Sequence, residues 1–549
     1  MVQQTGDVSP FSVSKRASIK GVLIVVTIVA LLISALSFSA SQLWSCPDTT
    51  YYVRLAGGIA DNLNFTDELF LIRPPGYPLM LAAIFALFGA NSPIAILIVQ
   101  YVLVVGITLV TVLTAWHLTY HRGVCLVAGL MCACSLQLLA FANMIITEVP
   151  YTFALVLSVY FLVKYHRLGH GQALALASLM AGVSYLIRPI GMTVVALCVV
   201  AVLHRAWKGW KDRAPATSSG VIRRSTSGFR RARTPARWRR AVGGLTLAVA
   251  PAMIVALPAV ALNRLVHGSN LSGLCSNLAL YHRIAAMDRL DSTESEAMGD
   301  IHAVVDEAIE QGHLAPDADF RQWGVVWRAY EKVRNVPLAE SSAVIGQAAR
   351  DLVMENLRPT LELTVRYSYW MIMVPDWWYR FHPGGTPGIV TETGECRADI
   401  TAEIFDVATY EPMLSHRIHP YDRYLPLTSE PRATTPLWSG IARWFYRHIQ
   451  KGPPLVGLGD SPYEEFCWLC LFGMLVSLVT RARMTWLLVT GVVFLQVVVS
   501  AWLAGPTPRY AVPVAPLMLL YAALFIVAPV WLTAAVLRFR RAPIASAHT

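Results

Sequence analysis

The chain is poor in charged residues for its length. Only 14% of its 549 residues are Asp, Glu, Lys or Arg, whereas 55% are hydrophobic. A soluble domain carries about a quarter charged residues. Several segments run for about 18 residues or more with almost no charge, which is the length that crosses the hydrocarbon core of a bilayer as a helix. The composition therefore excludes an ordinary soluble protein and predicts an all-α polytopic membrane protein.

Acidic residues are scarcest where the apolar segments are densest. Between Glu68 and Asp212 the chain has a single acidic residue, Glu148. A carboxylate in a membrane is costly unless it is paired or used in function. Glu148 is therefore either a site residue or the partner of a membrane cation such as Arg188, and the sequence leaves both readings open.

The basic residues are segregated along the chain. From Arg205 to Arg240 there are twelve basic residues and one acid, whereas residues 264–460 carry 18 basic against 25 acidic residues. Lys and Arg accumulate in the cytoplasmic loops of membrane proteins. The net charge of +11 thus reports topology and not a nucleic-acid partner. It predicts that 205–240 and both termini are cytoplasmic and that 264–460 lies outside.

Ten membrane spans follow from this topology, provided that residues 75–90 form an interfacial helix on the outer surface. The short segments around Arg188 widen the range to eight to twelve spans. The ten predicted spans are residues 21–44, 93–120, 124–146, 150–163, 173–186, 191–203, 241–262, 467–479, 484–504 and 511–537.

Three units result. Residues 1–262 are predicted to form an N-terminal transmembrane module with a first extracytoplasmic loop at 45–91. Residues 263–460 form a mainly helical extracytoplasmic segment, and 461–549 a C-terminal transmembrane module. No internal repeat is visible, although transporters usually contain one.

Metal-binding patterns are sparse. Cys467 and Cys470 form a CxxC inside a hydrophobic helical pattern, where packing explains them better than redox chemistry. His416 and His419 lack a third ligand. We therefore predict no metal-binding residues, while a divalent cation stays open as a cofactor.

Asp48 follows the first predicted span. Asp48, Tyr52 and Ala56 are spaced by four and share one face of a predicted helix. Asp48 could cap that helix or act as a catalytic carboxylate on the outer side.

A second motif, Arg73-Pro74-Pro75-Gly76-Tyr77-Pro78, opens the predicted interfacial helix on the same side as Asp48. Together the two motifs resemble the GT-C glycosyltransferases, especially the dolichyl-phosphate-mannose protein mannosyltransferase superfamily and the bacterial lipid A aminoarabinose transferases. Further similar patterns follow in the same order: Thr147–Tyr151, Leu186–Gly191, Asn277–Leu278 before Tyr281, and Pro508–Pro513. Residues from about 288 to 460 match no pattern of that superfamily.

The resemblance implies a membrane glycosyltransferase with residues 1–262 as its catalytic module. A hydroxyl of a lipid, glycan or protein acceptor would attack a polyprenyl-phosphate-linked sugar outside the cytoplasm, with inversion. Phosphate leaves without a proton donor, so one base suffices, and Asp48 is the predicted base with Glu148 as the alternative. The predicted substrate-binding residues are Tyr52, Arg73, Arg188, Arg283 and Arg509, because Arg can bind two phosphate oxygens. Each of these arginines could instead position other groups or extend its charge to the membrane surface.

Two other readings remain open from the sequence. A transporter or flippase of lipid-linked substrates also has many spans and few buried charges, and a degenerate relative could bind a lipid-linked glycan without catalysis. Loop lengths and the Arg-rich composition favour the bacterial inner membrane as the location.

Overall fold

The computed structural model describes residues 18–40, 47–89, 93–211, 234–268, 271–287, 290, 295–373, 389–390, 396–397, 462–480, 482–504 and 512–541. Three predicted features, Arg509, His416 and His419, lie outside the described residues. The regular elements are helices apart from β1 (Ile389–Val390) and β2 (Cys396–Arg397), which pair antiparallel with Ile389 opposite Arg397. The prediction of a helical membrane protein is thus confirmed.

The first half of the chain alternates long apolar helices with short ones. Its elements are α1 (Lys20–Ala40), α2 (Pro47–Asn62), the 3-10 helix η1 (Glu68–Leu71), α3 (Gly76–Phe88), α4 (Pro93–Thr119), α5 (Arg122–Ala133), α6 (Leu136–Ala142), α7 (Glu148–Leu168), α8 (Gly171–Ile187), the 3-10 helix η2 (Pro189–Met192), α9 (Thr193–Lys211) and α10 (Thr234–His267).

The second half places a group of polar helices before three apolar ones. Its helices are α11 (Leu271–Tyr281), the π-helix η3 (His282–Met287), α12 (Glu296–Glu310), α13 (Trp323–Arg334), α14 (Leu338–Glu355), α15 (Leu357–Met373), α19 (Pro462–Leu478), α20 (Arg483–Ala504) and α21 (Ala515–Arg541).

Among the described residues, six helices are long and apolar enough to cross a membrane, and a bent pair could add a seventh. The six lie at Lys20–Ser39, Ile94–Thr119, Pro189–Lys208, Ala241–His267, Arg483–Leu503 and Val512–Pro529. The other three predicted spans coincide with α7, α8 and α19. Each predicted span therefore has a helical counterpart, while ten membrane crossings stay a prediction.

The span predicted at 124–146 is not one straight helix. It is built from α5 and α6, whose axes differ by 44°. Ser135 begins the second piece, because its hydroxyl accepts a hydrogen bond from the Leu138 amide at 3.4 Å. A serine that caps a helix start competes with helix continuation, which accounts for the break.

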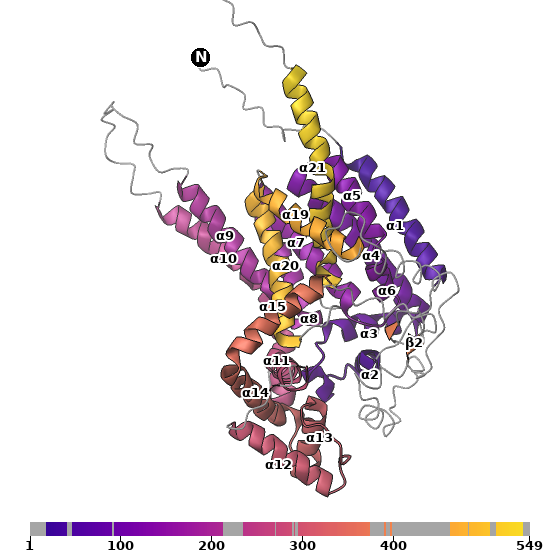
Figure 1. Ribbon diagram of the computed structural model, residues 1–549, viewed down its shortest axis with the longest axis vertical. Coiled ribbons are helices and arrows are strands. Elements are labelled where there is room, and N and C mark those ends of the chain that lie inside the picture. Colours follow the sequence, from indigo (N-terminus) through magenta and orange to yellow (C-terminus); the bar gives the residue numbers. More distant parts are fainter. Residues whose placement is uncertain are drawn as a thin grey trace, which may run out of the picture.

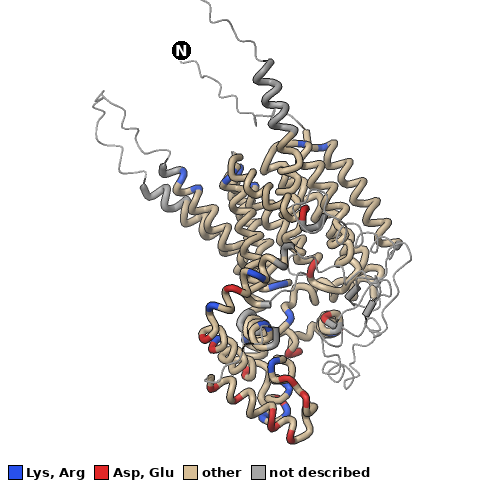
Figure 2. Tube along the Cα trace, viewed as in Figure 1, with Lys and Arg blue, Asp and Glu red and all other residues tan. Residues whose placement is uncertain are grey.

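The long helices form one bundle, and the polar helices α11–α14 lie at one end of it (Figure 1). The outer ends of α9 and α10, which flank the basic segment, lie toward the opposite end, as does the carboxyl end of α21 (Figure 1). Charged residues are sparse along the bundle and dense on α12–α14 (Figure 2). The sides of the membrane on which the basic loop and the 264–460 segment lie stay a prediction.

The polar helices have a hydrophobic core of their own. Residues of α12, α13 and α14, such as Ile301, Val326 and Ile345, are fully buried there. The Tyr281 hydroxyl donates to the Phe320 carbonyl at 2.8 Å and so ties α11 to the chain before α13. This core includes Leu71 of η1 and packs against Trp502 of α20, so the polar unit meets the main bundle at these two elements.

Candidate active site

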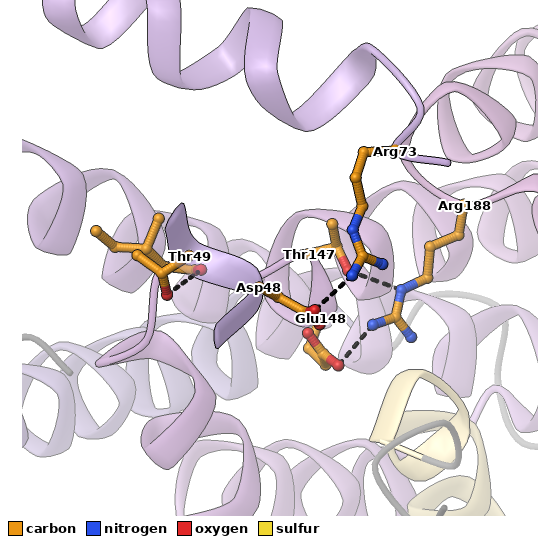
Figure 3. A network of polar contacts seen from close by, with 7 residues as sticks. Asp48, Thr49, Arg73, Thr147, Glu148 and Arg188 are labelled. Carbon is orange, nitrogen blue, oxygen red and sulfur yellow. Dashed lines mark hydrogen bonds and ion pairs between the residues drawn. The ribbon is translucent and has the colours of Figure 1, made fainter. Parts of the chain in front are cut away.

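Asp48 lies in the first turn of α2, as predicted. Its carboxylate pairs with the Arg73 guanidinium at 2.5 Å, and the two side chains are 17% and 26% exposed. The neighbouring Thr49 hydroxyl donates to the Ile145 carbonyl at 3.1 Å, which ties α2 to the chain before α7 (Figure 3). Tyr52 and Ala56 are buried on the helix face that they share with Asp48.

The Arg-Pro-Pro-Gly-Tyr-Pro motif brings Arg73 to Asp48 through a close helix contact. A Cβ on Gly76 would lie 2.6 Å from the Leu186 carbonyl oxygen, so only glycine lets α3 start against the end of α8. The Tyr77 ring packs edge-on against Tyr52 at 5.0 Å. The Arg73 guanidinium lies 5.6 Å from the centre of the Tyr52 ring, a distance at which cation–π attraction operates.

Glu148 and Arg188 form the second ion pair. The Arg188 guanidinium donates to Glu148 Oε1 at 2.5 Å and to the Thr147 hydroxyl at 2.8 Å. Glu148 is fully buried and Arg188 is 14% exposed. Among the described residues, the second carboxylate oxygen, Oε2, has no hydrogen-bond partner. The reading of Glu148 as the partner of Arg188 is thus observed, and it leaves a catalytic role open.

The two pairs lie in the same part of the structure, and in Figure 3 Arg73 reaches toward the Asp48 carboxylate and Arg188 toward that of Glu148. Tyr52 is close enough to all four charges to be affected by each. Burial raises the pKa of Tyr52 to about 12, with smaller and opposing effects of Arg73 and Asp48. The phenol is therefore neutral at physiological pH and cannot serve as the base there.

Gln100 was not singled out from the sequence, yet it holds the chain that leads to Glu148. This buried residue of α4 donates to the carbonyls of Ala142 and Met144 at 3.1 and 2.9 Å. An amide inside an apolar helix is costly unless it is hydrogen-bonded. An isolated glutamine in a predicted span is the signal that could have found it.

The remaining predicted arginines are not seen at the two pairs. Arg283 is fully buried, and it donates to the Trp502 carbonyl at 2.7 Å and to the Thr360 carbonyl at 3.0 Å. It therefore joins η3 to α15 and to the last turn of α20. A cation is favourable at the carboxyl end of a helix such as α20. Arg509 lies outside the described residues.

A metal would need several protein ligands. Among the described residues, no group of three His, Cys, Asp or Glu side chains could hold a metal ion.

The bundle and its paired charges define an integral membrane protein with a carboxylate–arginine site at one end of the helices. Residues 72–222 match the family described as dolichyl-phosphate-mannose-protein mannosyltransferase. The matched segment contains Arg73, Glu148 and Arg188, three of the four paired residues. The predicted resemblance to GT-C glycosyltransferases is confirmed over this part of the chain.

Solved structures of membrane glycosyltransferases share low overall similarity with the chain. The archaeal oligosaccharyltransferase AglB from Archaeoglobus fulgidus, in complex with an inhibitory peptide and a dolichol-phosphate, has 12% identity and a TM-score of 0.43, covering 97% of this chain and 52% of that one. ArnT from Cupriavidus metallidurans, bound to undecaprenyl phosphate, has 13% identity and a TM-score of 0.36, covering 93% and 79%. The chain thus spans about half the length of the archaeal enzyme. A search of curated proteins finds no match.

Proposed function

We propose that the chain is a membrane glycosyltransferase that moves one sugar from a polyprenyl-phosphate donor to a hydroxyl of a lipid, glycan or protein acceptor on the extracytoplasmic side. The observation that carries this proposal is the pair of adjoining carboxylate–arginine contacts, Asp48 with Arg73 and Glu148 with Arg188. The match of residues 72–222 to a glycosyltransferase family supports it. The bacterial inner membrane and cytoplasmic termini complete the proposal.

The reaction needs a base and a place for the leaving phosphate. The acceptor oxygen attacks the anomeric carbon from the face opposite the phosphate, which inverts that centre. The bond between the anomeric carbon and the phosphate oxygen breaks, and its electron pair leaves with the phosphate. The hydroxyl proton passes to a carboxylate, which is the general-base contribution.

Asp48 is the carboxylate we assign as the base. It is partly exposed, whereas Glu148 is fully buried, so an acceptor hydroxyl can approach Asp48 more directly. Arg73 donates a hydrogen bond to the Asp48 carboxylate. When the donor phosphate binds, Arg73 can transfer its hydrogen bonds to that phosphate and so free the carboxylate to accept the proton.

Arg73 and Arg188 are the residues we assign to the phosphate. The guanidinium fork matches phosphate oxygens, and its charge opposes the negative charge that grows on the leaving group. Glu148 and Thr147 fix the orientation of Arg188 from one side. In this assignment Glu148 orients Arg188 and does not accept the proton.

The test is sugar transfer by purified protein in proteoliposomes. Radiolabelled mannosyl- and glucosyl-phosphoundecaprenol serve as donors, with membrane lipid extract as acceptor, and each reaction is repeated with EDTA and with added Mg²⁺ or Mn²⁺ to assess cation dependence. The variant Asp48→Asn is compared with Asp61→Asn, which changes an exposed acid at the other end of α2. We expect Asp48→Asn to lower transfer by at least about a hundredfold and Asp61→Asn to retain it.

Two results would count against this function. Equal transfer by wild type and Asp48→Asn would remove Asp48 from the mechanism and leave Glu148 as the base. Movement of the labelled donor across the bilayer without transfer to any acceptor would favour a transporter. The topology is tested separately, because a reporter after Ser218 should be cytoplasmic and one near Ser292 should be outside.

A further inference from the structure

Arg188 is carried by a short turn that a distant membrane helix holds in place. The turn is η2, which follows directly from Arg188. Gln496, a buried residue of α20, donates from its side-chain amide to the Ile190 carbonyl at 3.3 Å and to the Thr193 hydroxyl at 2.9 Å. Gln496 thus anchors two points, the backbone just after Arg188 and the first residue of α9.

The oxygen of the Gln496 side-chain amide is linked to Arg188 through Tyr151. The Tyr151 hydroxyl donates to Gln496 Oε1 at 2.6 Å. The Tyr151 ring faces the Arg188 guanidinium, whose central carbon lies 5.7 Å from the ring centre. One glutamine therefore fixes both the backbone turn that carries Arg188 and the aromatic ring against which its side chain rests.

The bonding pattern of Gln496 differs from what membrane packing alone requires. A buried amide must satisfy its donors and its acceptor, and partners on any neighbouring helix would do. Here the donors go to the Arg188 turn and the acceptor takes the Tyr151 hydroxyl. Two of the three bonds end on elements that adjoin Arg188, namely η2 and α7, and the third ends on Thr193, where α9 begins.

We propose that Gln496 and Tyr151 are positioning residues for Arg188 and hold its guanidinium where the leaving phosphate gathers charge. The inference rests on the proposed function, because it assigns Arg188 to the phosphate. It predicts that the two residues affect the reaction only through Arg188. Neither residue touches the substrate in this scheme.

Tyr521 provides a matched control, because its hydroxyl bonds to the same helix, α20, as the Tyr151 hydroxyl does. It is a buried tyrosine of α21 whose hydroxyl bonds to Thr490 at 2.7 Å and to the Trp486 carbonyl at 3.1 Å, both on α20. Tyr151→Phe and Tyr521→Phe each delete one buried hydroxyl that bonds to α20. A general loss of packing would therefore affect both variants alike. An effect through Arg188 would affect Tyr151→Phe alone, because only Tyr151 faces Arg188.

The experiment measures kcat and KM for the donor in proteoliposomes, and binding of undecaprenyl phosphate to the purified protein. Tyr151→Phe, Gln496→Met, Tyr521→Phe and Arg188→Lys are compared, and Tyr151→Phe is also combined with Arg188→Lys. We expect Tyr151→Phe to lower kcat/KM by about three- to tenfold, the size of one net hydrogen bond. It should have no further effect in the Arg188→Lys background, since coupled residues are not additive. Tyr521→Phe should leave kcat/KM unchanged.

The outcomes separate this inference from the proposed function. Full multiplicative loss in the double variant, or an equal loss in Tyr521→Phe, would show a structural role and overturn the positioning assignment. Wild-type transfer with an unchanged Tyr151→Phe would overturn it as well and leave the proposed function intact. Absence of transfer and of undecaprenyl phosphate binding by the wild type would overturn the proposed function itself.

Discussion

The two carboxylate–arginine pairs have the same chemistry and opposite surroundings. In both, a guanidinium lies 2.5 Å from a carboxylate oxygen of the first turn of a helix, α2 for Asp48 and α7 for Glu148. Asp48 and Arg73 remain partly exposed, whereas Glu148 is fully buried. An acid in the first turn is favoured by the helix dipole in either place, so burial is what separates them.

Burial decides which pair can exchange partners. A buried carboxylate that loses its cation is left as an uncompensated charge, which is strongly unfavourable. Glu148 is therefore committed to Arg188. The Asp48–Arg73 pair keeps more contact with solvent, so an exchange of partners leaves less charge uncompensated there, and Arg73 can leave Asp48 when a phosphate offers better hydrogen bonds. The comparison teaches that one acid is suited to chemistry and the other to holding a cation.

The largest effect is expected for the exposed acid. Asp48→Asn keeps the shape of the side chain but removes the group that accepts the proton. We expect kcat for sugar transfer to fall by about 10²- to 10⁴-fold, the usual contribution of a general base. The apparent melting temperature should change little, because the side chain is partly solvated. Kinetics and thermal melting on the same preparation check both statements.

A large effect of Asp48→Asn on stability with little effect on turnover would contradict the assignment of Asp48 to the chemistry. If Asp48→Asn melted far below wild type while the surviving protein turned over normally, the Asp48–Arg73 pair would be structural. Asp61→Asn should match wild type in both measurements.

Glu148→Gln should show the reverse pattern. The amide keeps the volume but leaves Arg188 without its counter-charge, and breaking a buried pair costs about 3 to 5 kcal/mol. Because Arg188 retains Thr147 and some solvent, we expect the lower end of that range. Thermal melting in detergent measures the loss, and the KM for the donor should rise more than kcat falls. A variant as stable as wild type but without turnover would make Glu148 the base.

The sequence could predict the residues of this comparison but not their difference in burial. The spacing of Asp48, Tyr52 and Ala56 identified the α2 face, and the scarcity of acids identified Glu148. Which of the two carboxylates is exposed depends on how α2 and α3 pack on α8, and the hydrophobic periodicity of the sequence does not contain this information. The break between α5 and α6 was missed because Ser135 is one polar residue in an apolar run. The link from Tyr151 to Gln496 joins residues 345 apart in the chain, which local pattern cannot relate.

A smaller loss of stability and activity is expected at the contact between Gly76 of α3 and Leu186 of α8. Gly76→Ala would place a methyl group 2.6 Å from the Leu186 carbonyl oxygen, so α3 would have to move away from α8. Such overpacking costs about 1 to 3 kcal/mol and should shift Arg73 from Asp48. Thermal melting and donor KM should both worsen. Gly299→Ala is the matched control, since it has open space in α12 and should stabilise by up to about 1 kcal/mol.

The smallest effect is expected for Tyr52, which lies among the charges of both pairs. Its pKa of about 12, raised mainly by burial, keeps the phenol neutral from pH 6 to 10. The kcat/KM profile of Tyr52→Phe should therefore have the same shape as that of wild type over this range, with a loss below about threefold. Any alkaline limb that disappeared in the variant would contradict this.

The stability of the same two proteins tests the pKa independently. Because the folded protein binds the Tyr52 proton more tightly than the unfolded chain, whose tyrosine titrates near 10, this contribution is fully present below pH 10 and is lost as the pH rises toward 12. Wild type should therefore lose more thermal stability between pH 9 and 11 than Tyr52→Phe does. Equal losses of thermal stability in the two proteins would mean that Tyr52 has an ordinary pKa. The space around Tyr52 would then be open to water, and Tyr52 would again be a candidate for proton transfer.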